Sequence, residues 1–159
     1  MGLEIERKFL VHKHYLPELK EGVEIIQGYL SEIPSIRFRI INKAMFITIK
    51  EYYPEGKRFE LETPEKAITS EEIVKLQELA ISPPISKVRY KILDKGMSWE
   101  IDVYQGENSG LITADIELPS IDCPISFPAW IDSNKEITTD SRYSNFNLGR
   151  QPFSLWTKS

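Results

Sequence analysis

The chain has few of the features that mark a secreted or membrane protein. Among its 159 residues there is a single cysteine, Cys123, so no disulfide can form within the chain. No short apolar stretch with a cleavage site opens the sequence, and no apolar run is long enough to cross a bilayer. We therefore expect a cytoplasmic protein that does not associate with membranes.

The sequence also lacks an excess of positive charge. Its formal net charge is -4, so no overall attraction to nucleic acid is expected, and any site for a polyanion has to be built locally. A length of 159 residues with 41% hydrophobic content suits one globular domain, residues 1–159, that buries its core without crosslinks.

What the sequence does contain is a succession of short segments in which apolar and polar residues alternate. This pattern predicts strands at residues 3–11, 24–31, 35–42, 45–52, 57–63, 86–93, 98–105 and 111–118. Eight strands favour an antiparallel sheet that is large enough to close on itself. The expected fold class is α+β, mainly β: a closed eight-stranded antiparallel barrel with flanking helices.

Helices are expected at three places. Residues 69–80 form an apolar stripe at helical spacing, and Thr69 with Glu72 makes a capping box at its start. A shorter helical turn is expected after His14, around Pro17. Asp140 is expected to cap a last helix that Gly149 ends.

Charged residues gather on one face of most predicted strands, and apolar residues gather on the other. In an ordinary barrel such charges point to solvent. Two details favour the reverse arrangement. The charges form blocks of acids and blocks of bases, strand by strand, and the helix with the Pro-rich segments 83–86 and 123–131 has enough apolar residues to cover the outside of the sheet. The charged face would then line a lumen.

A charged lumen is stable only if it is wet or holds a ligand of matching charge, because unpaired buried charges cost several kcal/mol each. The basic residues are numerous, and guanidinium groups suit phosphate oxygens. Clustered acids would repel phosphates unless cations lie between, and carboxylates on adjacent strands suit Mg²⁺ or Mn²⁺. The inventory predicts a site for a chain of phosphates with divalent metal.

The motifs of this chain resemble those of the CYTH domain, the triphosphate tunnel metalloenzyme superfamily. The sequence EIERKF at residues 4–9 matches the E-x-E-x-K signature. The match continues in order through QGYL, the pair Arg37 and Arg39, Lys50, RFELE, the pair Lys87 and Arg89, WEIDVY, GLITADIEL and the terminal TDSRYSNFNL. The resemblance covers nearly the whole chain.

The resemblance implies an eight-stranded tunnel that binds a triphosphate group with Mg²⁺ or Mn²⁺. It implies a metal-binding set of Glu4, Glu6, Asp115 and Glu117, in which Asp115 stands where many relatives have Glu. It implies a phosphate-binding set of Lys8, Arg37, Arg39, Lys50, Arg58, Lys87 and Arg89. A third group would hold a second metal, orient the bases or position water: Glu60, Glu62, Glu100 and Asp102.

Hydrolysis of inorganic triphosphate to pyrophosphate and phosphate is the expected activity, because a chain this short has little material for a nucleobase pocket. Lys8, Lys87 and Glu6 are the catalytic candidates; Lys8 is either an acid/base group or a plain phosphate ligand. Alternative activities are a class IV-type adenylyl cyclase and a nucleoside or thiamine triphosphatase. An alternative of another class is a non-catalytic polyphosphate-binding module. The expected partner is a small-molecule triphosphate, and a homodimer is compatible with the sequence.

Overall fold

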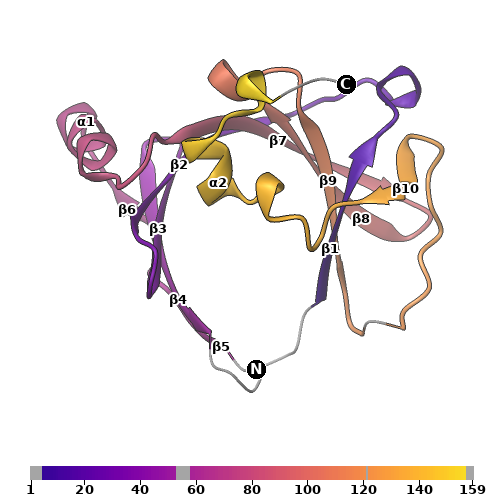
Figure 1. Cartoon of the computed structure of the whole chain (residues 1–159), viewed down its shortest axis with the longest axis horizontal. Coiled ribbons are helices and arrows are strands. Elements are labelled where there is room, and N and C mark those ends of the chain that lie inside the picture. The colour runs from indigo at the N-terminus through magenta and orange to yellow at the C-terminus, as the bar shows by residue number, and fades with distance from the viewer. Residues whose placement is uncertain (1–4, 53–57, 121, 157–159) are drawn as a thin grey trace.

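The structure, a computed structural model, describes residues 5–52, 58–120 and 122–156 (Figure 1). Within these residues ten strands form one antiparallel sheet. The strands are β1 (Ile5–Val11), β2 (Val23–Ser31), β3 (Ser35–Ile41), β4 (Ala44–Tyr52), β5 (Arg58–Glu62), β6 (Lys66–Ala67), β7 (Ile85–Asp94), β8 (Met97–Tyr104), β9 (Ile112–Leu118) and β10 (Ile131–Glu136). The helices are α1 (Ser70–Leu79) and α2 (Asn145–Arg150), and four 3₁₀ turns are η1 (Lys13–Tyr15), η2 (Gly106–Asn108), η3 (Ser141–Tyr143) and η4 (Phe153–Leu155).

The sheet is strongly curved, and its strand order is β10-β1-β9-β8-β7-β2-β3-β4-β5, with β6 paired to β4. Figure 1 shows an arc with β5 near one end and β1 near the other. The closed eight-stranded barrel of the sequence prediction is not what the described strands form, since they leave β10 and β5 as edges. On the edge of β1 that does not face β9, Phe9, Leu10 and Val11 pair with β10.

Each of the eight predicted segments contains a strand, which confirms a mainly antiparallel β fold with a few helices. Strands β6 and β10 were not predicted. The first has only two residues, Lys66–Ala67. The second, with the sequence IDSNKE, begins with a buried isoleucine and continues with polar residues, so it lacks the alternation that marks a half-buried strand.

The predicted helix at residues 69–80 is confirmed as α1 with its capping box. The Thr69 hydroxyl accepts a hydrogen bond from Glu72 N at 3.1 Å, and a Glu72 carboxylate oxygen accepts one from Thr69 N at 2.9 Å. The turn expected around Pro17 lies earlier in the chain, as η1 at Lys13–Tyr15.

The prediction for the last helix was wrong in two respects. Asp140 caps only η3, and Ser144, in extended geometry, caps the separate helix α2 through a hydrogen bond from Asn147 N. Gly149 lies inside α2 instead of ending it. A Cβ at this position would come within 2.4 Å of the carbonyl oxygen of Pro83, so only glycine permits this close approach.

Two of the three apolar clusters lie on the convex side of the sheet. The largest contains Phe9, Trp99, Ile101, Ala114, Ile116, Leu118, Trp130 and Ile131, with Cys123 and Ile125 of the Pro-rich segment packed against it. On β3, Phe38 and Ile40 pack with Ile73 and Leu76 of α1. A third cluster joins Ile85, Tyr104, Leu111, Ile137, Tyr143 and Leu148 beside α2. Helix α1 and the Pro-rich segment thus cover the convex side of the sheet. The charged face is the concave one, as expected for charges that line a lumen.

The structure also describes Cys123 and the length and composition of each helix. Cys123 is a half-buried free thiol. Among the described residues, no helix has both the length and the apolar character needed to cross a bilayer.

Candidate functional site

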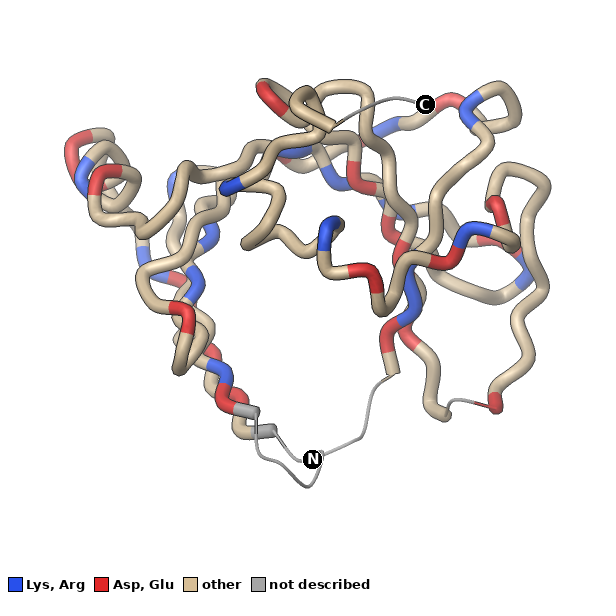
Figure 2. The backbone as a smooth tube through the Cα atoms, viewed as in Figure 1, with Lys and Arg blue, Asp and Glu red and all other residues tan. Residues whose placement is uncertain are grey.

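The concave face of the sheet encloses a cavity of about 910 Å³ that is lined mostly by charged residues. In Figure 2 acidic and basic residues recur along the strands of the arc. The basic residues of the lining are Lys8, Lys20, Arg37, Arg39, Lys50, Lys87, Arg89 and Lys91. The acidic residues are Glu6, Glu21, Glu60, Glu62, Glu100, Asp115 and Glu117. The structure therefore brings together nearly all the predicted site residues.

Three predicted residues do not appear in this lining. Glu4 lies outside the described residues, and the side chain of Arg58, at the start of β5, lies outside them as well. Asp102 is described and lies opposite Arg89, but it is only 1% exposed and does not reach the cavity surface.

Antiparallel register explains why residues far apart in the sequence meet in the cavity. On facing strands, directly opposite residues point to the same side of the sheet. Glu6 lies opposite Glu117, and Lys8 lies opposite Asp115. The remaining facing pairs are Arg89 with Asp102, Lys91 with Glu100, Glu100 with Asp115, and Lys50 with Glu60. Charged residues at alternate positions of neighbouring strands thus form one continuous charged wall.

Asp102 is the centre of the most deeply buried part of this wall. Its carboxylate lies 2.9 Å from Lys87 Nζ and accepts two hydrogen bonds from Arg89, at 2.8 Å from Nε and 2.9 Å from Nη2. Burial alone would raise the pKa of Asp102, but the charges of Lys87 and Arg89 hold it well below its ordinary value. The carboxylate is therefore ionised, and it fixes the directions of both cations.

The Lys87 ammonium is almost completely buried, with 2% of its side chain exposed. Burial lowers its pKa to about 8, although the neighbouring Asp102 acts in the opposite direction. Its Nζ also lies 5.6 Å from the centre of the Tyr104 ring. A negatively charged ligand in the cavity would favour the protonated form of this lysine.

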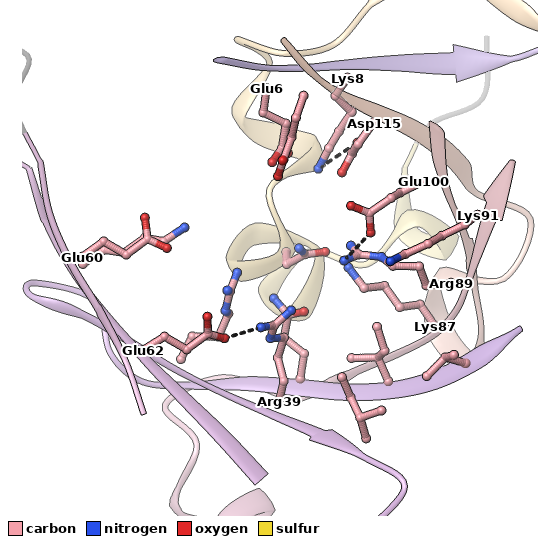
Figure 3. A pocket seen from close by; sticks show the side chains of 18 of the residues that line it. Glu6, Lys8, Arg39, Glu60, Glu62, Lys87, Arg89, Lys91, Glu100 and Asp115 are labelled. Atoms are coloured by element: carbon pink, nitrogen blue, oxygen red, sulfur yellow. Dashed lines mark hydrogen bonds and ion pairs between the residues drawn. The ribbon is translucent and has the colours of Figure 1, made fainter. Parts of the chain in front are cut away.

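Two further acids hold arginines toward the cavity (Figure 3). A Glu100 carboxylate oxygen lies 3.0 Å from Arg89 Nη1, and a Glu62 carboxylate oxygen lies 2.6 Å from Arg39 Nη2. Glu62 contacts Arg39 through Nη2. All three nitrogens of Arg89 contact Glu100 or Asp102, so a ligand would use those of its five N–H donors that these contacts leave over. The geometry supports an orienting role for Glu62, Glu100 and Asp102.

The carboxylates on β1 and β9 form the part of the wall with the chemistry of a cation site. Glu6 and Glu117 face each other across the two strands. Asp115 Oδ1 is buried, has no hydrogen-bond partner and lies 3.9 Å from Lys8 Nζ. Burial raises the pKa of Asp115 to about 7, Lys8 opposes this shift, and Glu6 adds to it. A cation would relieve this crowding of acids.

The donor set fits a hard divalent ion in kind, since carboxylate oxygens, water and phosphate are its usual ligands. Among the described residues, however, no three of the types His, Cys, Asp and Glu are close enough together to hold an ion by themselves. An ion at Glu6, Asp115 and Glu117 would therefore need ligands from water, from phosphate or from the N-terminal residues.

Some residues of the lining were not among the predicted site residues. Lys91 follows Lys87 and Arg89 on the same face of β7, so the alternation of charge was a signal for it. Gln27 and Asn145 also line the cavity, but as neutral residues they carried no charge signal. Lys20 and Glu21 precede β2 in a segment without strand or helix, where periodicity is uninformative.

Comparisons with known proteins place this chain among triphosphatases, although no family model matches it. It is 38% identical to an inorganic triphosphatase of Acetivibrio thermocellus over 155 residues, which cover 96% of this chain and 97% of the relative. It is 33% identical to an inorganic triphosphatase of Nitrosomonas europaea over 148 residues, covering 89% of this chain and 93% of the relative.

Solved structures show the same architecture. The crystal structure of the inorganic triphosphatase NE1496 is similar with a TM-score of 0.68 and 28% identity, covering 100% of this chain and 99% of that one. A candidate adenylate cyclase from Bacillus halodurans has a TM-score of 0.50 and 17% identity, with 75% of this chain and 82% of that one covered, and shares the fold alone. The curved sheet with a charged concave face thus defines a protein of the CYTH class. Within that class, the chain belongs to the family of bacterial inorganic triphosphatases.

Proposed function

We propose that the protein hydrolyses inorganic triphosphate to pyrophosphate and phosphate inside the charged cavity, with the help of a divalent metal ion. The observation that carries this proposal is a cavity of about 910 Å³ in which eight basic residues share the lining with seven acids. So many cations exceed what one carboxylate ligand needs and suit a chain of phosphates. The names of the two curated relatives support the choice of inorganic triphosphate.

The substrate would be held by basic residues of β1, β3, β4 and β7 and by Arg58 at the start of β5. The residues of the first four strands are Lys8, Arg37, Arg39, Lys50, Lys87 and Arg89. Their role is to neutralise the phosphate oxygens and to fix the chain of phosphates for in-line attack by water. Lys87 would remain protonated with substrate bound, because the phosphates favour its charged form.

The acids are proposed to have two roles. Glu62, Glu100 and Asp102 orient arginines and Lys87 through the contacts described above. Glu60, opposite Lys50 in the β4–β5 ladder, either orients that lysine or holds a second metal ion. We assign the first metal ion, Mg²⁺ or Mn²⁺, to Glu6, Asp115 and Glu117 with Glu4. When bound, such an ion supplies charge neutralisation at the phosphate oxygens and orients water.

Lys8, Lys87 and Glu6 are proposed as the residues that act on the reacting groups. Lys8 lines the cavity with its Nζ 3.9 Å from Asp115 Oδ1, and it either transfers a proton or only binds phosphate. The pH–rate profile of Lys8→Ala distinguishes these roles, since an unchanged profile at lower rate leaves Lys8 as a phosphate ligand. Glu6 would position the attacking water beside the metal ion. A cytoplasmic location and a homodimer stay predictions.

Phosphate release tests the proposal when inorganic triphosphate, ATP and thiamine triphosphate are compared with Mg²⁺, with Mn²⁺ and with a chelator. We expect strong metal-dependent release from inorganic triphosphate and much weaker release from the other two. Formation of cyclic AMP from ATP would instead identify a cyclase. Tight binding of triphosphate without turnover would identify a binding module.

A further inference from the structure

Gln27 is an uncharged residue in the wall of a cavity whose other polar residues are nearly all charged. It lies on β2, opposite Arg39 on β3 and opposite Ile85 on β7. It lines the cavity, yet its exposed fraction is only 1%. Its amide nitrogen Nε2 is buried and has no hydrogen-bond partner among the described residues.

An unpaired buried amide is unusual, because most buried polar side-chain atoms in folded proteins have a partner. A buried donor without a hydrogen-bond partner lowers the stability of the fold, whereas an apolar side chain of the same shape at this position would not lower it. The unpaired amide of Gln27 therefore suits a hydrogen bond to a bound ligand. Phosphate oxygens accept hydrogen bonds and would complete the bonding of Nε2.

Helix α2 brings a second amide to the same end of the cavity. Asn145 Oδ1 accepts a hydrogen bond of 2.8 Å from the Tyr104 hydroxyl, which leaves the Asn145 amide nitrogen for other acceptors. Phe146 packs edge to face on Tyr29, two residues beyond Gln27, with ring centres 5.3 Å apart. These contacts place α2 over the inner face of β2.

The surroundings of this end strengthen a hydrogen bond from Gln27. Its neighbour Ile85 belongs to an apolar cluster with Tyr104 and Leu148, and a hydrogen bond is stronger in less polar surroundings. The cations Arg39 and Lys87 line the adjoining wall of the cavity. A phosphate group bound there would meet two positive charges and a neutral amide donor, with apolar side chains behind them.

Resting on the proposed function, we propose that Gln27 is a substrate-binding residue that donates a hydrogen bond from Nε2 to a terminal phosphate of triphosphate at the α2 end of the cavity. The apolar cluster of Ile85, Tyr104 and Leu148 lies beside this end, and we therefore place the terminal phosphate there. Gln27 therefore contributes affinity for substrate at the expense of the stability of the empty protein.

The test compares Gln27→Met with the wild type in two measurements. Methionine keeps the length of the side chain and removes the amide. We expect KM for inorganic triphosphate with Mg²⁺ to rise about ten-fold or more, since one hydrogen bond to a charged group is lost, with a smaller change in kcat. The thermal midpoint of the ligand-free variant should equal or exceed that of the wild type. Gln77→Met, at a partly exposed glutamine of α1 outside the cavity lining, is the matched control and should change neither quantity.

An unchanged KM in Gln27→Met would overturn the proposal. So would a thermal midpoint that falls by several degrees, or a variant that does not fold, because either result shows that Gln27 supports the fold. Gln27→Glu provides a second test, since its carboxylate should repel phosphate and raise KM further than methionine does. If the wild type binds triphosphate without hydrolysing it, the proposed function fails, and the Kd of the same variants from calorimetry then decides the role of Gln27.

Discussion

The carboxylate of Asp102 lies 2.9 Å from the ammonium of Lys87, and the two side chains are only 1% and 2% exposed. This ion pair joins β8 to β7 directly behind the phosphate cavity, and Arg89 completes it with two hydrogen bonds to the same carboxylate. A buried ion pair is weak evidence for net stabilisation, because desolvation of two charges is costly. Its value here lies in holding two cations toward the cavity in fixed directions.

Asp102→Asn should destabilise the protein, because it leaves the buried Lys87 ammonium without its counter-charge. Loss of one partner of a buried pair costs about 3–5 kcal/mol, and we expect a loss near the lower figure because the amide oxygen still accepts a hydrogen bond. Urea unfolding at neutral pH measures it. The exposed Asp122→Asn is the control, expected within about 0.5 kcal/mol of the wild type. A loss below about 1 kcal/mol for Asp102→Asn would contradict the assignment.

The contribution of Asp102 to stability should depend on pH in a defined direction. Its pKa is held below the ordinary value of 3.8 in the folded protein, so the unfolded chain binds the proton more readily. The stabilisation is fully present above that ordinary value and is lost as the pH falls toward the folded-state pKa. The difference in unfolding free energy between wild type and Asp102→Asn should therefore shrink from pH 7 to pH 3. A difference that is constant over this range would show that folding does not lower the pKa of Asp102.

Arg39→Ala should weaken substrate binding far more than the loss of an arginine elsewhere. The variant removes a cation from the cavity and frees the Glu62 carboxylate, which then repels phosphate. We expect KM for inorganic triphosphate to rise by roughly 10- to 100-fold, since charge-assisted hydrogen bonds are worth about 1.5–3 kcal/mol. Arg142→Ala, whose side chain is 65% exposed and pairs with Asp140, is the control. Equal effects of the two substitutions would argue against a phosphate site at Arg39.

Metal binding by the carboxylates on β1 and β9 can be measured without turnover. Binding of Mn²⁺ to the substrate-free protein, followed by electron paramagnetic resonance, should be weakened about ten-fold or more in Glu6→Gln and in Glu4→Gln, because hard cations need charged oxygen ligands. Glu71→Gln on the exposed surface of α1 should bind Mn²⁺ as the wild type does. Full activity of Glu4→Gln would remove that residue from the metal set.

Much of this fold could be predicted from the sequence, because alternation of apolar and charged residues is a local property. Segments such as 35–42 and 86–93 repeat this pattern over a whole strand, and both are strands in the structure. Strand β10 is different. Its pairing with β1 depends on Leu10 and Val11 finding Asp132 and Ile131, more than 100 residues away, and no local pattern encodes such a contact.

The site was predictable to the extent that it is charged. Alternation of charge predicted Lys87 and Arg89, and the register then places Arg89 opposite Asp102 of β8. Orientation was not predictable, because which acid binds a metal ion and which holds an arginine depends on distances of a few ångströms. Asp102 illustrates this limit, since its contacts with Lys87 and Arg89 support an orienting role. Gln27 shows a second limit of sequence-based prediction, because an amide can be identified as unpaired only when its neighbours in the structure are known.

The most direct test of the account is ³¹P nuclear magnetic resonance of inorganic triphosphate incubated with the protein and Mg²⁺ or Mn²⁺. The account predicts that the triphosphate signals disappear while pyrophosphate and phosphate appear in equal amounts, and that a chelator stops the conversion. Persistence of the triphosphate signals with metal present, while the protein binds triphosphate tightly, would contradict it.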